Sequence, residues 1–486
     1  MGKDVLSNDV PSLRPVTRRG VICGLVGAAI GLGLAGCAPA PTPTPAPAKP
    51  APTPAAKPDE PAKPAAAPAP TGGPVTIEFM TRGGEYILNV TKQQVEAFNK
   101  EYPNVKVNID MTTGNHFEKL QLRIAGGNPP DAYFDAMRTT GLAYHKKIAV
   151  DLEPYLRADK SFSPDDFIKS AWLCQVYGNK RYGLAWDSGA MALCFNIDLF
   201  NKAGVPLPDP KKRMSWEEVL ETGRKLTLDF NGKRPGESGF DPKQIKQYGF
   251  EPSAMHGHEG WIYTNGGEII AEDGTTVPID SPEAIEAYQF LADFGAKHYV
   301  APSPEFQQSQ PMTFQAATVA MSHAGVWMLG RTNDAGVNWG VAPFPAKKTP
   351  VSYGQYSGLV MTTQSKLKDQ AWQWMWWSCM SKPGQTILVD TGMLQPTRKD
   401  LQSLFVDNPK PPAKQYRQVF VDELDEKTMR WPGDKAGSFY MGWRQPWIDM
   451  WGPMFDPVLR GRKQFKEIAG EARGKLEHLL KTGEVT

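Results

Sequence analysis

The sequence predicts an α/β protein whose folded body is divided into two domains. Short runs that alternate between apolar and polar residues follow runs with helical spacing, which indicates sheets flanked by helices. This succession occurs in the first half of the body and again in the second half. From residue 75 onward the chain has about 410 residues, too many for one hydrophobic core. We therefore expect two units, each a mostly parallel sheet with helices on both faces.

The first half of the body supplies the clearest alternation. Its predicted elements are strands at 75–80, 105–109 and 129–136 and helices at 89–102 and 116–125. In open sheets of this kind, ligands bind at the carboxyl ends of the strands. Glu85, Asn115 and Asp135 follow or end these strands, so we expect them to contact a ligand.

The second half repeats the pattern less regularly. Its predicted elements are helices at 281–297, 372–380 and 463–481 and a short helix that leads into a strand at 314–321. Four of the fourteen tryptophans fall on one of these helices, at Trp372, Trp374, Trp376 and Trp377. An aromatic cluster on a helix is usually part of a core, and we expect that here.

The N-terminus resembles an export signal. An apolar run over residues 20–36 follows two arginines and ends at Cys37. A basic start, a short apolar stretch and small residues are typical of a secretory signal peptide. The run is short for a membrane-spanning helix, which needs about 20 apolar residues. Residues 34–37 resemble the lipobox of bacterial lipoproteins, so we expect cleavage after residue 36 and lipidation of Cys37.

The two arginines, Arg18 and Arg19, also give residues 17–22 a partial resemblance to a twin-arginine signal, and ordinary export is the alternative. Behind Cys37, residues 37–74 are rich in proline and alanine. Such a composition cannot bury enough apolar surface to fold. We expect this segment to be a disordered tether for the body.

Charge and cysteine content exclude several classes of function. The chain has 54 Lys+Arg against 52 Asp+Glu, a balance that argues against a nucleic-acid partner and a polyanionic ligand. The cysteines after Cys37 are Cys174, Cys194 and Cys379, an odd number that rules out a full disulfide framework. Cys174 and Cys194 could pair, but we favour three small buried thiols.

Motifs for catalysis or cofactor binding are weak. His256 and His258 lie in a His-Gly-His-Glu segment, and the sequence has no third metal ligand at a spacing typical of metal sites. The sequence contains no GxSxG motif, P-loop or glycine-rich dinucleotide turn. We therefore expect no metal, no cofactor and no enzymatic activity.

A series of short motifs follows one order along the body. The strongest is YGLAWDSG at 182–189, followed by ALCFNIDLF at 192–200. The others lie at 126–134, 203–206, 215–218, 280–284, 314–327, 340–345 and 392–397. Together they resemble the sugar-type extracellular solute-binding proteins of ABC transporters, the family that includes maltose-binding protein.

This resemblance implies a two-lobed periplasmic-binding-protein-like fold with three hinge crossings. Lobe I would comprise 75–187 and 346–392, lobe II 193–342 and 397–486, and the crossings would lie at 185–192, 340–345 and 392–397. It also implies ligand capture for the transmembrane subunits of an ABC permease. The expected protein is a monomer, lipid-anchored to the outer face of the cell membrane.

A sugar site needs flat aromatic rings for the C–H faces and fixed polar groups for the hydroxyls. The residues in loops or near crossings that we expect to contact the ligand are Trp186, Asp187, Trp261, Trp327, Tyr356, Ser357, Trp443 and Arg444. For each tryptophan, packing in the core is the alternative.

Other ligands are compatible with the same resemblance. They are a polyol, a compatible solute, a peptide or a sugar phosphate, and a sensor subunit would have the same fold. A phosphate would need several converging cationic or backbone donors, and the obvious cations are Arg82, Arg138 and Arg444. A surface glycoside-processing enzyme is the alternative from another class. The sequence does not specify which sugar is bound.

Overall fold

The computed structural model describes residues 73–136, 139–159, 161–177, 180–252, 258–271, 273–304, 312–352, 354–425, 427, 429 and 444–484. The chain divides into two compact units, Met1–Glu60 and Pro61–Thr486, and every described residue belongs to the second. The predicted signal peptide, Cys37 and nearly all of the predicted tether therefore lie outside the described residues.

The first sheet has five strands in the order β2-β1-β3-β12-β6. They are β1 (Val75–Arg82), β2 (Val105–Thr112), β3 (Ala132–Asp135), β6 (Gly183–Ala185) and β12 (Gly358–Met361). β1 is parallel to β2 and β3, whereas β12 is antiparallel to β3 and β6. A separate hairpin consists of β4 (Val176–Tyr177) and β5 (Lys180–Arg181).

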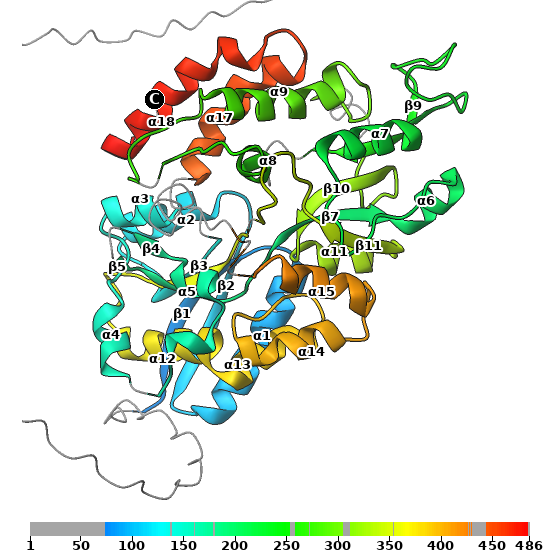
Figure 1. Ribbon diagram of the computed structural model, residues 1–486. Coiled ribbons are helices and arrows are strands. Elements are labelled where there is room, and N and C mark those ends of the chain that lie inside the picture. Colours follow the sequence, from blue (N-terminus) through cyan, green and yellow to red (C-terminus); the bar gives the residue numbers. More distant parts are fainter. Residues whose placement is uncertain are drawn as a thin grey trace, which may run out of the picture. The chain divides into compact units, whose positions relative to one another are not determined.

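Helices α1 and α12 pack against this sheet, and α13 packs against both of them (Figure 1). The helices that belong to this part of the chain are α1 (Glu85–Glu101), α2 (His116–Ala125), α3 (Thr140–His145), α4 (Glu153–Ala158), α5 (Lys169–Leu173), α12 (Lys368–Met380) and α13 (Lys382–Asp390). A 3₁₀ turn, η1, covers Pro164–Asp166.

The second sheet has five strands in the order β11-β7-β10-β9-β8. They are β7 (Met191–Asn196), β8 (Leu228–Asp229), β9 (Ile245–Glu251), β10 (Val319–Gly325) and β11 (Trp339–Pro343). Only the β9–β10 ladder is parallel among the described strands of this sheet.

Helices α7 and α15 pack against the second sheet, while α9, α17 and α18 pack together (Figure 1). The helices of this part are α6 (Ile197–Ala203), α7 (Trp216–Leu226), α8 (His258–Thr264), α9 (Pro282–Ala296), α11 (Met328–Asp334), α14 (Gln402–Asp407), α15 (Lys414–Asp422), α17 (Arg444–Leu459) and α18 (Ala469–Thr482). The 3₁₀ turns η2 (Lys399–Leu401) and η3 (Phe465–Glu467) complete the set.

The α/β class is as predicted, but the expectation of mostly parallel sheets is wrong in detail. Both sheets are mixed, and the second is mainly antiparallel. The reason is that β6, β7, β11 and β12 are connected by segments that pass between the sheets. Such connections do not impose the parallel direction that a βαβ crossover imposes.

Local sequence signals explain where several helices begin. Asn115 caps α2 by accepting from the backbone N–H of Glu118, and Ser281 caps α9 in the same way. Two boundaries differ from the prediction. α1 begins at Glu85 rather than at Asn89, since Gly84 takes the capping position. Residues 314–317 form a turn instead of a helix before β10.

Two of the four tryptophans of α12 lie in the core as expected, and Trp372 and Trp376 are half-buried against it. Trp374 is fully buried, with its ring 5.3 Å from that of Phe98 and 5.7 Å from that of Phe79. Trp377 is buried beside it. Cys174, Cys194 and Cys379 are free, buried thiols, so the pairing of Cys174 with Cys194 does not occur.

The chain passes between the sheets at two places that the strands define. It leaves the first sheet after Ala185 and enters the second at Met191. It leaves the second sheet after Pro343 and returns to the first at Gly358. The backbone at 346–349 bonds to Met214 and Thr264 among second-sheet elements, so packing with that part of the chain continues beyond the crossing predicted at 340–345.

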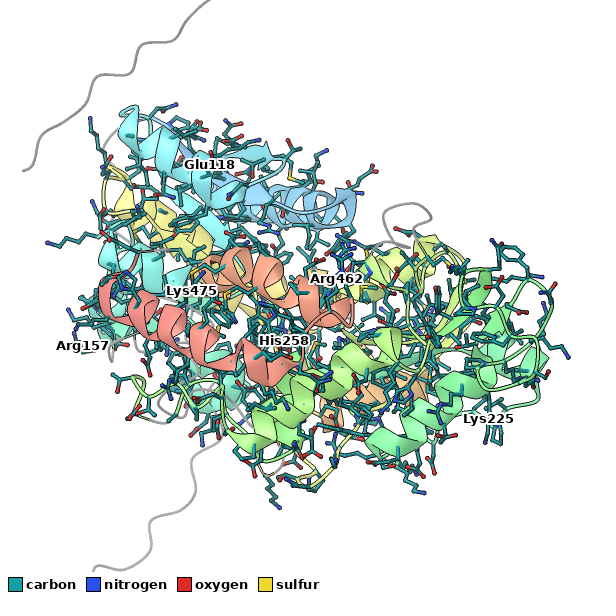
Figure 2. The ribbon with its side chains drawn as sticks, turned by 90° about the horizontal axis from the view of Figure 1, so that it is seen from above. Glu118, Arg157, Lys225, His258, Arg462 and Lys475 are labelled. Atoms are coloured by element: carbon teal, nitrogen blue, oxygen red, sulfur yellow. The ribbon has the colours of Figure 1, made fainter. Side chains whose placement is uncertain are left out.

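Charged side chains are distributed over the surface, and many polar side chains of the described residues are buried. Glu118, Arg157 and Lys225 are exposed, whereas His258 is buried (Figure 2). None of the described helices is long and apolar enough to cross a membrane.

Candidate functional site

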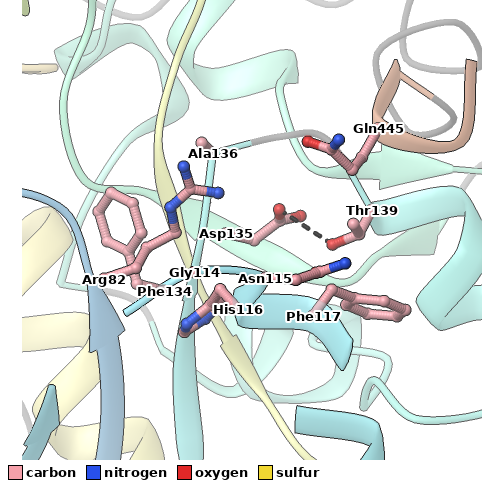
Figure 3. A pocket seen from close by; sticks show the side chains of 10 residues that line it. All are labelled: Arg82, Gly114, Asn115, His116, Phe117, Phe134, Asp135, Ala136, Thr139 and Gln445. Carbon is pink, nitrogen blue, oxygen red and sulfur yellow. Dashed lines mark hydrogen bonds between the residues drawn. The ribbon is translucent and has the colours of Figure 1, made fainter. Parts of the chain in front are cut away.

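A cavity of about 200 Å³ opens at the carboxyl ends of β1 and β3 (Figure 3). This is the edge of the first sheet at which a ligand is expected. Its walls come from both strand ends, from the start of α2, from the loop before α3 and from α17. The lining residues are Arg82, Gly114, Asn115, His116, Phe117, Phe134, Asp135, Ala136, Thr139 and Gln445.

Asp135 provides a fixed carboxylate in this cavity. It is the last residue of β3 and is 4% exposed. Its Oδ1 accepts a hydrogen bond of 3.1 Å from the Thr139 hydroxyl, and its Oδ2 accepts one of 3.0 Å from the Thr140 hydroxyl. Figure 3 shows the Asp135–Thr139 bond at the edge of the cavity. These two bonds fix the carboxylate at the wall of the cavity, and a carboxylate oxygen can accept more than one hydrogen bond.

Donor groups line the same cavity. Arg82 is the last residue of β1 and offers a guanidinium, which can only donate. Asn115 uses its side-chain oxygen to cap α2, so its amide nitrogen is available for another acceptor. The site therefore combines a held acceptor with donors, the set that a ligand with many hydroxyl groups requires.

His116 adds a neutral ring to the wall. Its Nδ1 lies 2.6 Å from the hydroxyl oxygen of Thr112. Burial, and then the positive charge of Arg82, lower the pKa of His116 to about 4. The imidazole is therefore uncharged near neutral pH, and among the described residues of the wall the ionisable side chains that remain are Arg82 and Asp135.

Gln445 reaches the cavity from a distant part of the sequence. It lies in the first turn of α17, and its side-chain nitrogen donates a 2.8 Å hydrogen bond to Asp449. Its side-chain oxygen can still accept from a ligand. This residue, with Arg82, His116 and Thr139, is absent from the set predicted to contact a ligand. Arg82 could have been included as a strand-end residue, but no local pattern indicates Gln445.

The segments that pass between the sheets are bonded to one another. Asp187 is 6% exposed, and its Oδ1 accepts a 2.6 Å hydrogen bond from the backbone N–H of Ser357. Burial raises the pKa of Asp187 to about 7, while the bonds from Ser357 act in the opposite direction. Ser188 donates from its backbone N–H to Gln395 and from its hydroxyl to the Pro396 carbonyl. Asp187 and Ser357 thus pair with each other in these segments.

Three residues predicted to contact a ligand are buried and have hydrogen-bond partners inside the protein. Trp186 is 2% exposed and donates from its indole nitrogen to the Gln94 side chain at 2.7 Å. Trp261 is fully buried and donates to His323 at 2.8 Å. The hydroxyl of Tyr356 donates to Ser170. Because each polar atom has a partner inside the protein, burial of these side chains is not penalised.

The remaining predicted residues are dispersed. Glu85 is exposed at the start of α1, and Trp327 is half-buried just before α11. Arg444 begins α17, and nothing is described of its side chain. Trp443 and His256 lie outside the described residues. Of the predicted set, the cavity brings together Asn115 and Asp135.

A metal site is not found among the residues that the structure describes. No group of three or more His, Cys, Asp or Glu side chains in that part of the chain is placed to hold an ion. His258 is buried in α8, where its ring stacks at 6.2 Å on that of Trp451.

Comparison with known proteins identifies the family to which the chain belongs. The model of the family described as bacterial extracellular solute-binding protein matches residues 84–378, more than half of the chain. The chain belongs to this family, whose members bind solutes outside the cytoplasm.

Individual relatives and solved structures agree with this class. A putative binding protein of Brucella abortus is 27% identical over 304 residues, which cover 61% of this chain and 69% of the relative. A maltotriose-binding protein of Pyrococcus abyssi is 23% identical over 60% of this chain and 59% of its own length.

Two solved structures share the fold. An ABC substrate-binding protein of Listeria monocytogenes, in complex with cycloalternan, matches with a TM-score of 0.71 and 24% identity over 84% of this chain and 99% of its own. The maltose/maltodextrin-binding domain of Bdellovibrio bacteriovorus, bound to maltotriose, matches with a TM-score of 0.65 and 18% identity over 84% of this chain and all of its own.

Proposed function

We propose that this protein captures a carbohydrate outside the cytoplasm and delivers it to an ABC importer. The observation that carries the proposal is the pairing of a held carboxylate, Asp135, with the donors Arg82 and Asn115 in one cavity of a solute-binding fold. Hydroxyl groups both donate and accept, so they can satisfy all of these groups at once. Relatives whose names or structures include maltotriose and cycloalternan support the same class of ligand.

In this proposal each residue of the cavity has a distinct role. Asp135 accepts from a sugar hydroxyl, and Arg82 and Asn115 donate to sugar oxygens. Gln445 contributes a contact from α17, a helix that packs against α9 rather than against the first sheet. A ligand that contacts both parts favours a conformation in which they are closer together, because only differential contacts shift such an equilibrium.

We propose two lobes built on the two sheets, with boundaries at 75–187 and 346–392 for lobe I and 193–342 and 397–486 for lobe II. The bonds that residues 346–349 make to Met214 and Thr264 favour moving the start of the second lobe I segment toward Gly358. In the proposed cycle the closed form is recognised by the permease subunits. The protein acts as a monomer and performs no catalysis.

The proposed location is the outer face of the cell membrane. Cleavage after residue 36 and lipidation of Cys37 would anchor the chain, and residues 37–74 would form the tether. The twin-arginine route is the proposed export path, with ordinary export as its alternative. Mass spectrometry of the membrane fraction distinguishes an acylated Cys37 from an intact N-terminus.

A sugar phosphate, polyol, compatible solute or peptide is the competing ligand class. Among the described residues, the cavity contains one cation, Arg82, and it also contains the carboxylate of Asp135. A phosphate would be repelled by that carboxylate, so the observed charges favour an uncharged ligand.

Thermal melting of the purified mature protein against a panel of sugars, polyols, amino acids and phosphorylated sugars tests the proposal. A ligand present at about 100 times its Kd adds about 2.7 kcal/mol of stability, which raises Tm by several degrees. We expect such a shift with at least one sugar. A shift with amino acids alone would reject the carbohydrate as the ligand and keep the fold.

A further inference from the structure

Gln175 is a buried residue in a backbone conformation that side chains rarely adopt. It lies in the turn between α5 and β4, with a φ of 60° and 1% of its surface exposed. Its backbone carbonyl accepts a hydrogen bond of 2.9 Å from the N–H of Tyr182, which closes the turn. Glycine adopts this left-handed conformation without strain, whereas glutamine does so at a cost in free energy. Strained residues of this kind cluster at functional sites.

The side chain of Gln175 lies over two glycines of neighbouring strands in the first sheet. Gly183 is the first residue of β6, and Gly358 is the first residue of β12. A Cβ added at Gly358 would lie 2.8 Å from Nε2 and 3.0 Å from Cγ of Gln175, and one added at Gly183 would lie 3.2 Å from the same Cγ. Gly358 is also the partner of Asp135 in the ladder between β12 and β3. The glycines thus leave room for the Gln175 amide beside the strand end that carries Asp135.

The orientation of this amide follows from its neighbours. Nε2 of Gln175 lies 3.4 Å from the backbone carbonyl oxygen of Asp135, to which only a donor can bond. The amide oxygen therefore faces the other way, and it lies 2.6 Å from the hydroxyl oxygen of Thr140. Gln175 is thus an acceptor for Thr140 and is itself held by the backbone of Asp135.

The Thr140 hydroxyl lies between two acceptors but has one proton to donate. Its oxygen is 2.6 Å from Oε1 of Gln175 and 3.0 Å from Oδ2 of Asp135. Because a hydroxyl is a single donor, Thr140 can donate to one of these oxygens at a time. Oδ1 of Asp135 accepts from Thr139 in either case. Turning the Thr140 hydroxyl toward Gln175 therefore vacates an acceptor position on Oδ2, while the carboxylate stays held through Oδ1.

We infer that Gln175 is a positioning residue for ligand binding at Asp135, because it takes over the hydrogen bond of Thr140 when a ligand hydroxyl donates to Oδ2. The inference rests on the proposed carbohydrate function and adds a residue that does not itself line the cavity. Displacing a buried donor from its acceptor costs free energy if the donor is left unpaired. Gln175 removes that cost, since Thr140 keeps an acceptor when the ligand binds.

Affinity for maltotriose, measured by calorimetry on the mature protein, tests this exchange. Gln175→Met keeps an unbranched side chain and the same backbone strain but removes the acceptor, so Thr140 can then donate only to Asp135. We expect binding about tenfold weaker than in the wild type, because the ligand must compete with Thr140 for Oδ2. Adding Thr140→Val should recover most of the loss, since the competing hydroxyl is then absent. Wild-type affinity in Gln175→Met, or a double variant that binds as weakly as Gln175→Met, would overturn the inference.

Two further variants separate this role from a structural one. Gln94→Met makes the same change at another buried glutamine, whose amide bonds to the carbonyls of Ser378 and Gly384, and it should lower Tm but leave affinity unchanged. An equal loss of affinity in Gln94→Met would overturn the inference. Gln175→Asn covers the case in which methionine is not accommodated, because asparagine adopts a positive φ more readily and its shorter side chain does not reach Thr140. It should show the same loss of affinity and the same recovery with Thr140→Val.

The contact between Gln175 and Thr140 can also be measured without any ligand. Urea unfolding of Gln175→Met, Thr140→Val and the double variant gives the coupling between the two residues. We expect the double variant to lose less stability than the sum of the single losses, because both partners of a buried hydrogen bond are then removed together. Additive losses would contradict the inference. If the wild-type protein binds neither maltotriose nor any other sugar of the panel, the proposed function fails, and the unfolding results still decide whether Gln175 is the acceptor for Thr140.

Discussion

Gln385 and Trp186 are joined by a hydrogen bond of 2.8 Å from the side-chain nitrogen of Gln385 to the Trp186 carbonyl. The side-chain oxygen of Gln385 accepts from the backbone N–H of Thr397 at 2.7 Å and from its hydroxyl at 2.9 Å. One fully buried amide of α13 thus connects the end of the first sheet, where the chain crosses to β7, with the segment that leads to α14. It fixes two segments that are far apart in the sequence.

Replacing this amide should destabilise the protein. Gln385→Ala leaves the Trp186 carbonyl and the Thr397 N–H buried without this partner, which costs about 2–4 kcal/mol in total. Urea unfolding of wild type and variant measures the difference. Gln418→Ala is the control, because Gln418 pairs only with Asp422 on the exposed face of α15 and should change stability by less than about 0.5 kcal/mol. Equal effects of the two substitutions would contradict the role given to Gln385.

The buried carboxyl of Asp187 predicts a pH dependence of stability. Its pKa is about 7 in the folded protein against an ordinary value of 3.8. A carboxyl whose pKa is raised on folding contributes stability that is complete below pH 3.8 and is lost as the pH rises through 7. Asp187→Asn keeps an acceptor for the Ser357 N–H and cannot ionise, so its stability should improve relative to wild type across this range.

The size of that improvement is about 1.4 kcal/mol for each pH unit between the two pKa values. Unfolding curves at a series of pH values from about 4 to 8 measure it. Asp273→Asn serves as the control, because the pKa of the Asp273 carboxyl is shifted in the opposite direction. Hydrogen bonds from Thr276 and Thr275 lower it to about 2. The stability that Asp273 contributes is lost only as the pH falls from 3.8 toward 2, so its variant should show a constant difference at higher pH. If the difference in unfolding free energy between Asp187→Asn and wild type did not change with pH, the prediction would be contradicted.

Removing the carboxylate of Asp135 should abolish most of the affinity for the ligand. A hydrogen bond to a charged group contributes about 1.5–3 kcal/mol, so Asp135→Ala should weaken binding about ten- to a hundredfold. Calorimetric titration with the sugar identified by thermal melting gives the number. Glu118→Ala, on the exposed face of α2 outside the cavity, should bind as wild type does.

Trp186 should affect stability and leave binding unchanged. Trp186→Phe keeps an aromatic ring in the core but removes the hydrogen bond to the buried Gln94 oxygen. That oxygen still accepts from the Ser378 hydroxyl, so the loss should cost about 0.5–1.5 kcal/mol. Urea unfolding measures the effect on stability, and calorimetric titration of the same preparation with the sugar measures the effect on affinity. A large loss of affinity with unchanged stability would show that Trp186 contacts the ligand after all.

The order of elements around the first sheet could be predicted because its signals are local. The first residues of β1 and β2 alternate between more and less buried positions, and Asn115 caps α2. In contrast, β7 and β10 are buried along their whole length, so they carry no alternation from which a strand direction could be inferred.

The residues that line the cavity were predicted less completely than the fold, for reasons of geometry. Asp135 could be predicted because it ends a strand at a sheet edge where ligands bind. The hydrogen bond of Trp186 could not be predicted, since its partner Gln94 lies 92 residues earlier in the chain. Gln445 enters the cavity through the packing of α17, which no local pattern encodes.

Titration calorimetry of a sugar panel into the mature wild-type protein and its Asp135→Ala variant tests the central claim most directly. The account predicts that at least one mono- or oligosaccharide binds the wild type saturably, and that the variant binds the same sugar at least about tenfold more weakly. Binding that Asp135→Ala leaves unchanged, or a wild type that binds no sugar of the panel, would contradict it.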